Sequence, residues 1–275
     1  MPRGLFYLAA VTSTLRNALL VAGLFAVVVA ASIFYSRAIR QSPAIETAET
    51  TPAALESAFL HAGIQDGLRA VQDTRLEDAR TSFESVPSSD PGYLIARQNL
   101  VAVLVRSGDL AGAATVLQEI AALQPDNPSI AEHLAWAYYG LADYERAELY
   151  ALRGLEIDGR LTHLRYAVGL FRLASGRTIE AIPAYKRAME ADTKRTHVTE
   201  ALTRLMTLGQ ERPELSAVHY TLAFFANALR RKELEIQELE KYLAAEPTGP
   251  IADTARARLA EARGTALPAS PSSGS

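Results

Sequence analysis

The hydrophobic and polar positions divide this chain into an apolar run near its start and a long amphipathic body. Residues 18–35 contain neither a charge nor a proline. In the body, apolar residues recur at intervals of three and four, which places them on one face of a helix. Leu134, Tyr138 and Leu141 form one such stripe. The pattern predicts an all-α protein in which one transmembrane helix precedes a series of amphipathic helices.

The apolar run predicts a transmembrane helix over residues 15–36, after an N-terminal tail of residues 1–14. A helix of this kind rises about 27 Å over 18 residues, close to the roughly 30 Å hydrocarbon core of a bilayer. Arginines on both sides can reach the headgroups. Two other interpretations stay open: a signal peptide cleaved after the small residues of 28–32, and a buried soluble helix.

The basic residues around this run bear on its orientation. Two arginines and the free amine precede it, and the two arginines that follow it are soon joined by glutamates. The positive-inside rule then favours a cytoplasmic N-terminus and a body outside the inner (plasma) membrane, in the periplasm. A body that faces the cytoplasm is the alternative. Residues 37–51 are predicted to be a linker, and residues 265–275 a tail that is disordered by composition.

The body repeats with a period of 34 residues. A small residue recurs at that interval, and an apolar residue follows it four positions later in each case. The recurring small residues are Ala79, Ala113, Ala147 and Ala181. Two antiparallel helices that cross closely need a side chain of this size at the crossing, so we expect the alanines to mark helical hairpins. The predicted hairpins span residues 60–93, 94–127, 128–161 and 162–195.

This pattern resembles the tetratricopeptide repeat, W-x2-L-G-x2-Y, then A-x3-F, then P. The best matches begin at Leu100, Leu134 and Val168. The resemblance implies a solenoid of stacked helix hairpins over residues 52–264, with about five repeats and a capping helix. After residue 195 the frame breaks; residues 197–215 read as a helix that stops at Gly209, and the repeat resumes 20 residues late. Residues 251–263 read as the capping helix.

A second stripe on the first helix of the third hairpin indicates a binding surface. Glu132, Trp136 and Tyr139 lie on a helix face turned by about 200° from the core stripe. In repeats that look like this, that face lines the concave groove of the solenoid. The predicted partner-binding groove consists of Gln98, Ala102, Val105, Glu132, Trp136, Tyr139, Tyr166, Leu170, Tyr220 and Phe224.

The groove is predicted to be aromatic and apolar with little charge. It lacks the lysines with which some relatives hold a carboxylate, so it suits an apolar or amphipathic helix of a protein partner. The alternative is that Trp136 and Tyr139 pack under the next repeat, or are covered by the chain's own N-terminal helix or tail.

Composition excludes several classes of chemistry. The chain has no cysteine, so it forms no disulfide and has no thiolate nucleophile or cysteine-ligated zinc. The body after residue 45 is net acidic, which argues against nucleic acid as a partner. The five histidines show no paired spacing, and no catalytic or phosphate-binding motif is present. We expect no enzyme activity, no metal and no cofactor.

Together these features predict a membrane-anchored interaction scaffold that recruits, assembles or stabilises a membrane or envelope complex. The bilayer would be contacted through residues 15–36. In layout the chain resembles periplasmic repeat proteins that are anchored beside the secretion translocon. One alternative is an accessory subunit of a respiratory, photosynthetic or secretion complex, held mainly by its transmembrane helix. Another is a binder of cell-wall glycan, since aromatic platforms stack on sugars.

Overall fold

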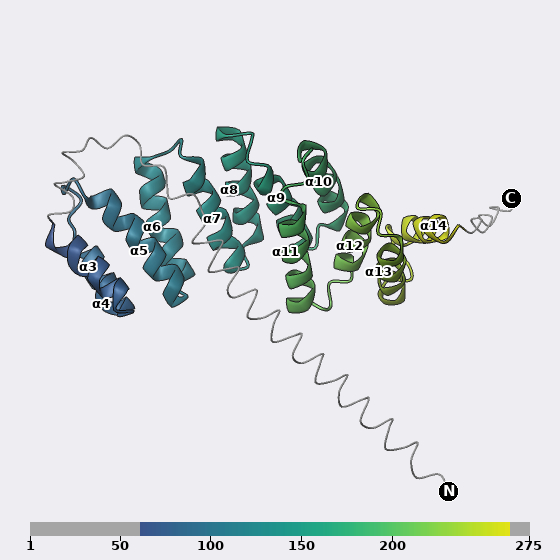
Figure 1. The fold of residues 1–275 in the computed structure, drawn as a ribbon, viewed down its shortest axis with the longest axis horizontal. Coiled ribbons are helices and arrows are strands. Elements are labelled where there is room, and N and C mark those ends of the chain that lie inside the picture. The colour runs from purple at the N-terminus through teal and green to yellow at the C-terminus, as the bar shows by residue number, and fades with distance from the viewer. Residues whose placement is uncertain (1–60, 265–275) are drawn as a thin grey trace, which may run out of the picture. The chain divides into compact units, whose positions relative to one another are not determined.

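The computed structural model describes residues 61–264, which form twelve α-helices and no strand (Figure 1). The helices are α3 (Ala62–Gln72), α4 (Leu76–Glu84), α5 (Tyr93–Ser107), α6 (Leu110–Leu123), α7 (Pro128–Gly140), α8 (Tyr144–Ile157), α9 (Thr162–Ala174), α10 (Thr178–Ala191), α11 (Val198–Glu211), α12 (Ala217–Ala228), α13 (Lys232–Ala245) and α14 (Ala252–Arg263).

Ten of these helices pair into five hairpins that stack in chain order. The pairs are α3–α4, α5–α6, α7–α8, α9–α10 and α12–α13, and the capping helix α14 packs on the last of them. Each hairpin contacts the next through its second helix, as α4 packs on α5 and α8 on α9. The described residues therefore form the all-helical solenoid that the repeat predicts. The remaining helix, α11, stands alone between the fourth and fifth hairpins.

Burial confirms the repeat frame position by position. Ala79, Ala113, Ala147 and Ala181 have no exposed surface. Four residues after each, Phe83, Leu117, Ala151 and Tyr185 are also buried, with at most 2% of their surface exposed. The alanines let the paired helices approach, and the larger residues fill the space beside the crossing.

The turn inside each hairpin repeats as well. Thr74, Gly108, Ala142 and Gly176 lie 34 residues apart and have φ values of 62°, 83°, 57° and 80°. This left-handed conformation is easily adopted by glycine but is strained for other residues. The first and third hairpins thus hold a threonine and an alanine in a turn that suits glycine, because the stacked helices fix the same geometry in each repeat.

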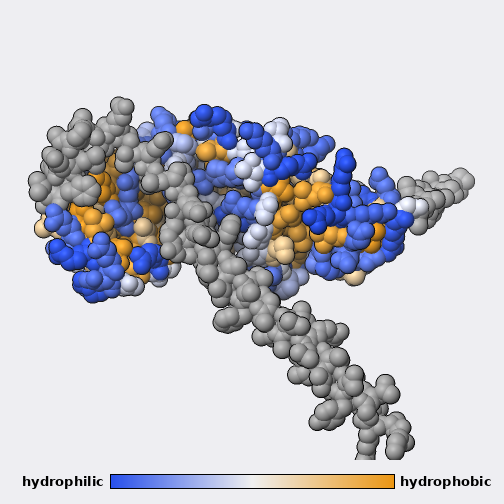
Figure 2. Space-filling model, viewed as in Figure 1, coloured by the Kyte–Doolittle hydropathy of each residue, from blue (hydrophilic) through white to orange (hydrophobic). Residues whose placement is uncertain are grey.

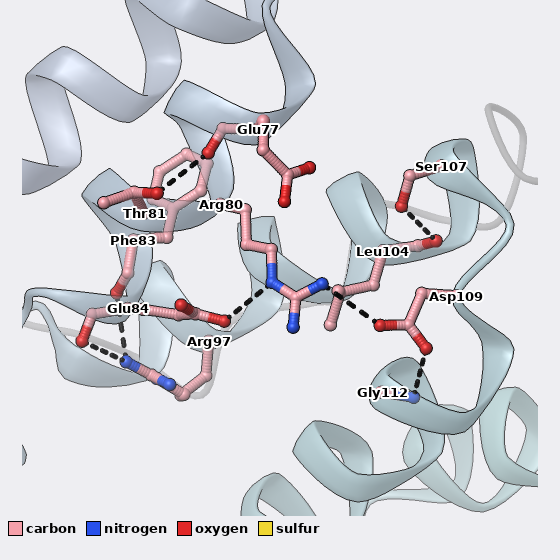
Figure 3. A network of polar contacts seen from close by, with 10 residues as sticks. All are labelled: Glu77, Arg80, Thr81, Phe83, Glu84, Arg97, Leu104, Ser107, Asp109 and Gly112. Atoms are coloured by element: carbon pink, nitrogen blue, oxygen red, sulfur yellow. Dashed lines mark hydrogen bonds and ion pairs between the residues drawn. The ribbon is translucent and has the colours of Figure 1, made fainter.

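Ion pairs join neighbouring hairpins. Arg80 of α4 lies between two carboxylates (Figure 3): its Nε is 3.0 Å from Glu84 Oε1, and its Nη1 is 3.2 Å from Asp109 Oδ2. Asp109 in turn accepts a hydrogen bond of 2.8 Å from the backbone N–H of Gly112, so it also caps α6. Arg97 of α5 donates to the backbone oxygen of Phe83 at 3.0 Å. These contacts tie the first two hairpins together.

The predicted transmembrane helix of residues 15–36, the tail of residues 1–14, the linker of residues 37–51 and the C-terminal tail of residues 265–275 lie outside the described residues, as do residues 52–60 of the predicted solenoid. Within residues 61–264, no helix combines the length and the apolar character needed to cross a bilayer.

Candidate partner-binding face

The predicted groove residues all lie on the first helices of hairpins, namely α5, α7, α9 and α12. We call the side of the solenoid formed by these four helices the first-helix face. The structure does not leave this face empty, because α11 packs against α9 and α12 (Figure 1). The candidate site is therefore a surface that one helix of the same chain partly covers.

Helix α11 runs in the same direction as α7 and α9. At its start, the His197 ring lies 5.6 Å from that of His163, at the start of α9. In its middle, the Arg204 guanidinium lies over the ring of Trp136. After its end, Arg212 Nη1 reaches the hydroxyl of Tyr144 at 3.5 Å. An amphipathic helix of the chain thus lies along the central part of the predicted groove.

A small cavity marks the seam between α11 and the groove. Trp136, Tyr166 and Leu170 line it from α7 and α9, and Ala201 and Arg204 line it from α11. Tyr166 and Leu170 are only 4% and 2% exposed, so a partner can reach them only if α11 moves. The segment that covers this part of the groove is α11, whereas the alternative named the N-terminal helix or the tail, which lie outside the described residues.

Trp136 is partly buried among aromatic rings and one cation. Its ring meets Phe171 edge-on at 5.3 Å and Tyr139 edge-on at 5.8 Å. The Arg204 Cζ atom lies 3.8 Å from the centre of the indole, which is a close cation–π contact. Arg204 also donates to Glu200 Oε1 at 2.8 Å, so its charge is paired along α11.

Glu132 and His163 form an ion pair between α7 and α9, with 3.1 Å between Glu132 Oε1 and His163 Nε2. Burial disfavours the protonated imidazole, but the hydrogen bond and charge of Glu132 outweigh it and raise the pKa of His163. Burial likewise disfavours the carboxylate, and His163 outweighs that effect and lowers the pKa of Glu132. The charged forms of the two side chains therefore stabilise each other.

Asp192 anchors the loop that leads into α11. Its carboxylate accepts hydrogen bonds of 2.9 Å from the backbone N–H groups of Thr196 and His197, and the hydroxyl of Tyr166 donates to it at 3.3 Å. Burial works against this carboxylate, but the backbone donors prevail and lower its pKa. The start of α11 is thus fixed to α9 through a buried polar network.

The other predicted groove residues fall into two groups. Tyr220 is 6% exposed and packs with Tyr242 in the core of the last hairpin, so it does not share the cavity with Trp136. Phe224 is partly buried, edge-on to Phe225 at 5.8 Å. At the other end, Ala102 of α5 is exposed, and Gln98 and Val105 of the same helix are partly exposed.

Apolar surface is visible in two places on the face seen in this view. Figure 2 shows it over α5 and α6, and again over α11 and α12. Met206 of α11 is an exposed apolar residue, with 55% of its surface accessible. Within the described residues, no group of three or more histidine, aspartate or glutamate side chains is placed to hold a metal ion.

Sequence reasoning placed a helix near residue 198 but missed its position on the groove. The helix continues past Gly209 to Glu211, so the predicted stop is wrong. Leu208 is buried on this helix, whereas Met206 is 55% exposed. The available signal was the 20-residue break in the frame, which is long enough for one extra helix outside the stack.

Comparison with known proteins agrees with this geometry. The family model described as Tetratricopeptide repeat matches residues 70–132 and 104–161. These segments cover the interlocking hairpins from α4 to α8, where the 34-residue frame is most regular. Residues 70–161 thus match the tetratricopeptide repeat, and the described residues as a whole form an all-helical solenoid of stacked hairpins. Proteins with such repeats mediate protein–protein interactions, and the fold is typical of non-catalytic scaffolds.

Individual relatives are distant. The TPR repeat-containing protein YpiA of Bacillus subtilis (strain 168) is 25% identical over 142 residues, which is 50% of this chain and 32% of YpiA. The chain thus matches about a third of that relative's length. Among solved structures, MamA MSR-1 shares 19% identity with a TM-score of 0.42, over 70% of this chain and 97% of that one. YrrB, described as a TPR protein with an unusual peptide-binding site, shares 16% identity with a TM-score of 0.40, over 74% and 96%.

Proposed function

We propose that this protein is a membrane-tethered scaffold that binds an amphipathic helix of a partner protein on its first-helix face. In doing so it recruits, assembles or stabilises a membrane or envelope complex. The observation that carries the proposal is the position of α11, since an amphipathic helix already lies parallel to α7 and α9 on that face. A surface that accepts one such helix has the spacing and chemistry to accept another.

The uncovered part of the face supplies the first contact for a partner. Ala102 is exposed on α5, with Gln98 and Val105 partly exposed one turn to either side. These side chains are small or uncharged, so a partner helix can approach the backbone of α5 closely without desolvating a charge. Partner residues with aliphatic side chains at i, i+4 and i+7 fit such a stripe.

The tether is the predicted helix of residues 15–36, with the solenoid on the extracytoplasmic side. Support for it comes from the uncharged run and its flanking arginines. A tethered scaffold meets membrane partners at an effective concentration on the order of millimolar, so each contact can be individually weak. Such a scaffold holds a complex together without any catalytic group.

Co-purification of the full-length protein from cross-linked membranes tests the proposal. Glutamates introduced together at Ala102 and Val105 place two charges on the open part of the face, and the bound partner should be lost. Leu149→Glu is the matched control, because Leu149 is 61% exposed on α8, the second helix of a hairpin. A partner that survives the double variant and is lost from the control would overturn the proposed surface.

A further inference from the structure

Helix α11 covers the central part of the first-helix face, and its contacts indicate whether it is a fixed part of the solenoid. Helix α12 contacts both α11 and α10: Phe225 of α12 packs on Tyr185 of α10 at 5.1 Å, so the fourth and fifth hairpins also touch directly, beside α11. Helix α11 is thus an additional, unpaired helix that packs on α9 and α12. The contact between Tyr185 and Phe225 does not involve a residue of α11.

The two sides of α11 differ in character. Val198, Ala201, Leu205 and Leu208 are buried. The outer side carries a row of threonines, in which Thr203 and Thr207 each donate a side-chain hydrogen bond to the backbone oxygen four residues earlier. Threonine is a poor helix former, and this bonding pattern weakens helices slightly. Helix α11 therefore depends on its docked side for its order.

The N-terminal end of α11 suits a hinged element. Its N-cap residue, His197, makes no side-chain capping hydrogen bond. The preceding loop is held separately, because Asp192 binds the backbone of residues 196 and 197 and Arg195 adopts a left-handed φ of 55°. The helix can leave the face while the loop stays anchored to Tyr166.

We propose that α11 is a displaceable occupant of the α7–α9 surface, and that the partner of this protein is an amphipathic helix of the same pattern. This inference rests on the proposed function. The partner presents a small residue and two leucines in the places of Ala201, Leu205 and Leu208, and an arginine in the place of Arg204, which stacks on Trp136. When the partner helix binds, it takes the place of α11 on this surface, and the apolar side of α11 becomes exposed.

A peptide copy of residues 196–212 provides a probe of known composition. Against the full-length protein it competes with a tethered helix whose effective concentration is on the order of millimolar, so its binding should be weak. Ala201→Asp places a carboxylate on the docked side and should free the face. In that variant the labelled wild-type peptide should bind at least ten-fold more tightly, as measured by fluorescence anisotropy of the full-length protein in detergent micelles.

Two controls keep the comparison specific. Thr203→Asp adds the same charge on the exposed side of α11 and should leave peptide affinity at the wild-type value. A peptide that itself carries Ala201→Asp should not bind any of the proteins. Trp136 is the single tryptophan of the chain, so its emission reports whether an arginine again lies over the indole when the wild-type peptide binds.

Hydrogen exchange on the unmodified full-length protein tests the same idea without a variant. The amides of α11 should exchange at least ten-fold faster than those of α9 and α12, because local opening of α11 leaves the stack intact. Equal protection of the three helices would overturn the inference. So would a folded Ala201→Asp variant that binds the peptide no better than wild type does. A partner that binds at Ala102 and leaves exchange in α11 unchanged would overturn the inference and leave the proposed function standing.

Discussion

Glycine at position 169 decides how closely α9 and α10 approach. A Cβ atom built there would lie 2.9 Å from Cγ and Cδ1 of Tyr185, well inside ordinary carbon contact distance. Alanine also favours the helix by about 1 kcal/mol relative to glycine, so two effects of opposite sign compete. The Tyr185 ring cannot retreat, because it is 1% exposed and packs against Phe225.

The steric effect should prevail. Overpacking a well-filled core costs roughly 1–3 kcal/mol, and contact with the face of a fixed ring belongs in the upper part of that range. After the gain in helix propensity, we expect Gly169→Ala to lower the free energy of unfolding by about 1–2 kcal/mol. For a solenoid of about 200 residues this corresponds to a Tm that is lower by roughly 2–8 °C.

Thermal unfolding followed by circular dichroism measures the effect. Gly159→Ala is the matched control, because a Cβ atom there would meet its nearest neighbour at an ordinary 3.7 Å. Combining Gly169→Ala with Tyr185→Leu should remove the penalty, which a double-mutant cycle detects as a coupling energy. A Gly169→Ala variant as stable as wild type would refute the claim that this crossing is fixed by the aromatic ring.

Three further predictions concern polar groups that are buried or partly buried. Glu148→Ala leaves the guanidinium groups of two partly exposed arginines without their shared carboxylate, so we expect urea titration to give a loss of about 1–3 kcal/mol in the free energy of unfolding. Tyr185→Phe removes a buried hydroxyl that has no hydrogen-bond partner, so stability should stay unchanged or rise by up to about 1 kcal/mol in the same assay. His163→Gln should destabilise more at about pH 5.5 than at about pH 8.5. Because the pKa of His163 is raised in the folded state, the ion pair stabilises the protein at low pH and this stabilisation is lost as the pH rises through the folded pKa of His163. Because the pKa of Glu132 is lowered, the stabilisation from its carboxylate is kept as the pH falls to about 4.5.

Each of these predictions has its own check. Glu180→Ala removes a carboxylate that is 53% exposed beside the same Arg177, and should cost less than about 0.5 kcal/mol. If Tyr185→Phe were strongly destabilising, the hydroxyl would have a partner that the structure lacks. If His163→Gln had the same effect at both pH values, the ion pair with Glu132 would not contribute to stability.

The hairpins were predictable because one local rule recurs. Each of Ala79, Ala113, Ala147 and Ala181 occupies the same crossing, so the 34-residue period locates four hairpins without any knowledge of long-range contacts. The turns follow from the same period. Short-range sequence patterns therefore account for α3 to α10 and for the hairpin that follows the break.

Departures from the repeat could not be interpreted from sequence, because their partners come from other elements. Arg172 stands where a tyrosine is usual, and its Nε binds Glu148 of the preceding hairpin at 2.8 Å. Glu235 stands where an alanine is expected, and it is buried against Arg258 of α14 at 2.9 Å. In both cases a paired charge replaces the packing residue.

The candidate site shows the same limit. Periodicity places Trp136 on the first-helix face, and it shows that residues near 198 form a helix. It does not show that α11 lies on α7, because Arg204 and Trp136, which make that contact, are 68 residues apart. Tyr220 illustrates the converse: the repeat frame assigns it to the groove, while packing against α13 and α14 places it in a core.

Site-specific photo-crosslinking from residue 102 in intact cells tests the central claim most directly. With a photoreactive residue in place of Ala102, the full-length protein should form one prominent adduct with another membrane or envelope protein. The crosslinked peptide of that partner should be an amphipathic helix, and the same residue at Leu149 should give no such adduct. Adducts that are equally abundant from both positions, or that contain only this chain, would contradict the account.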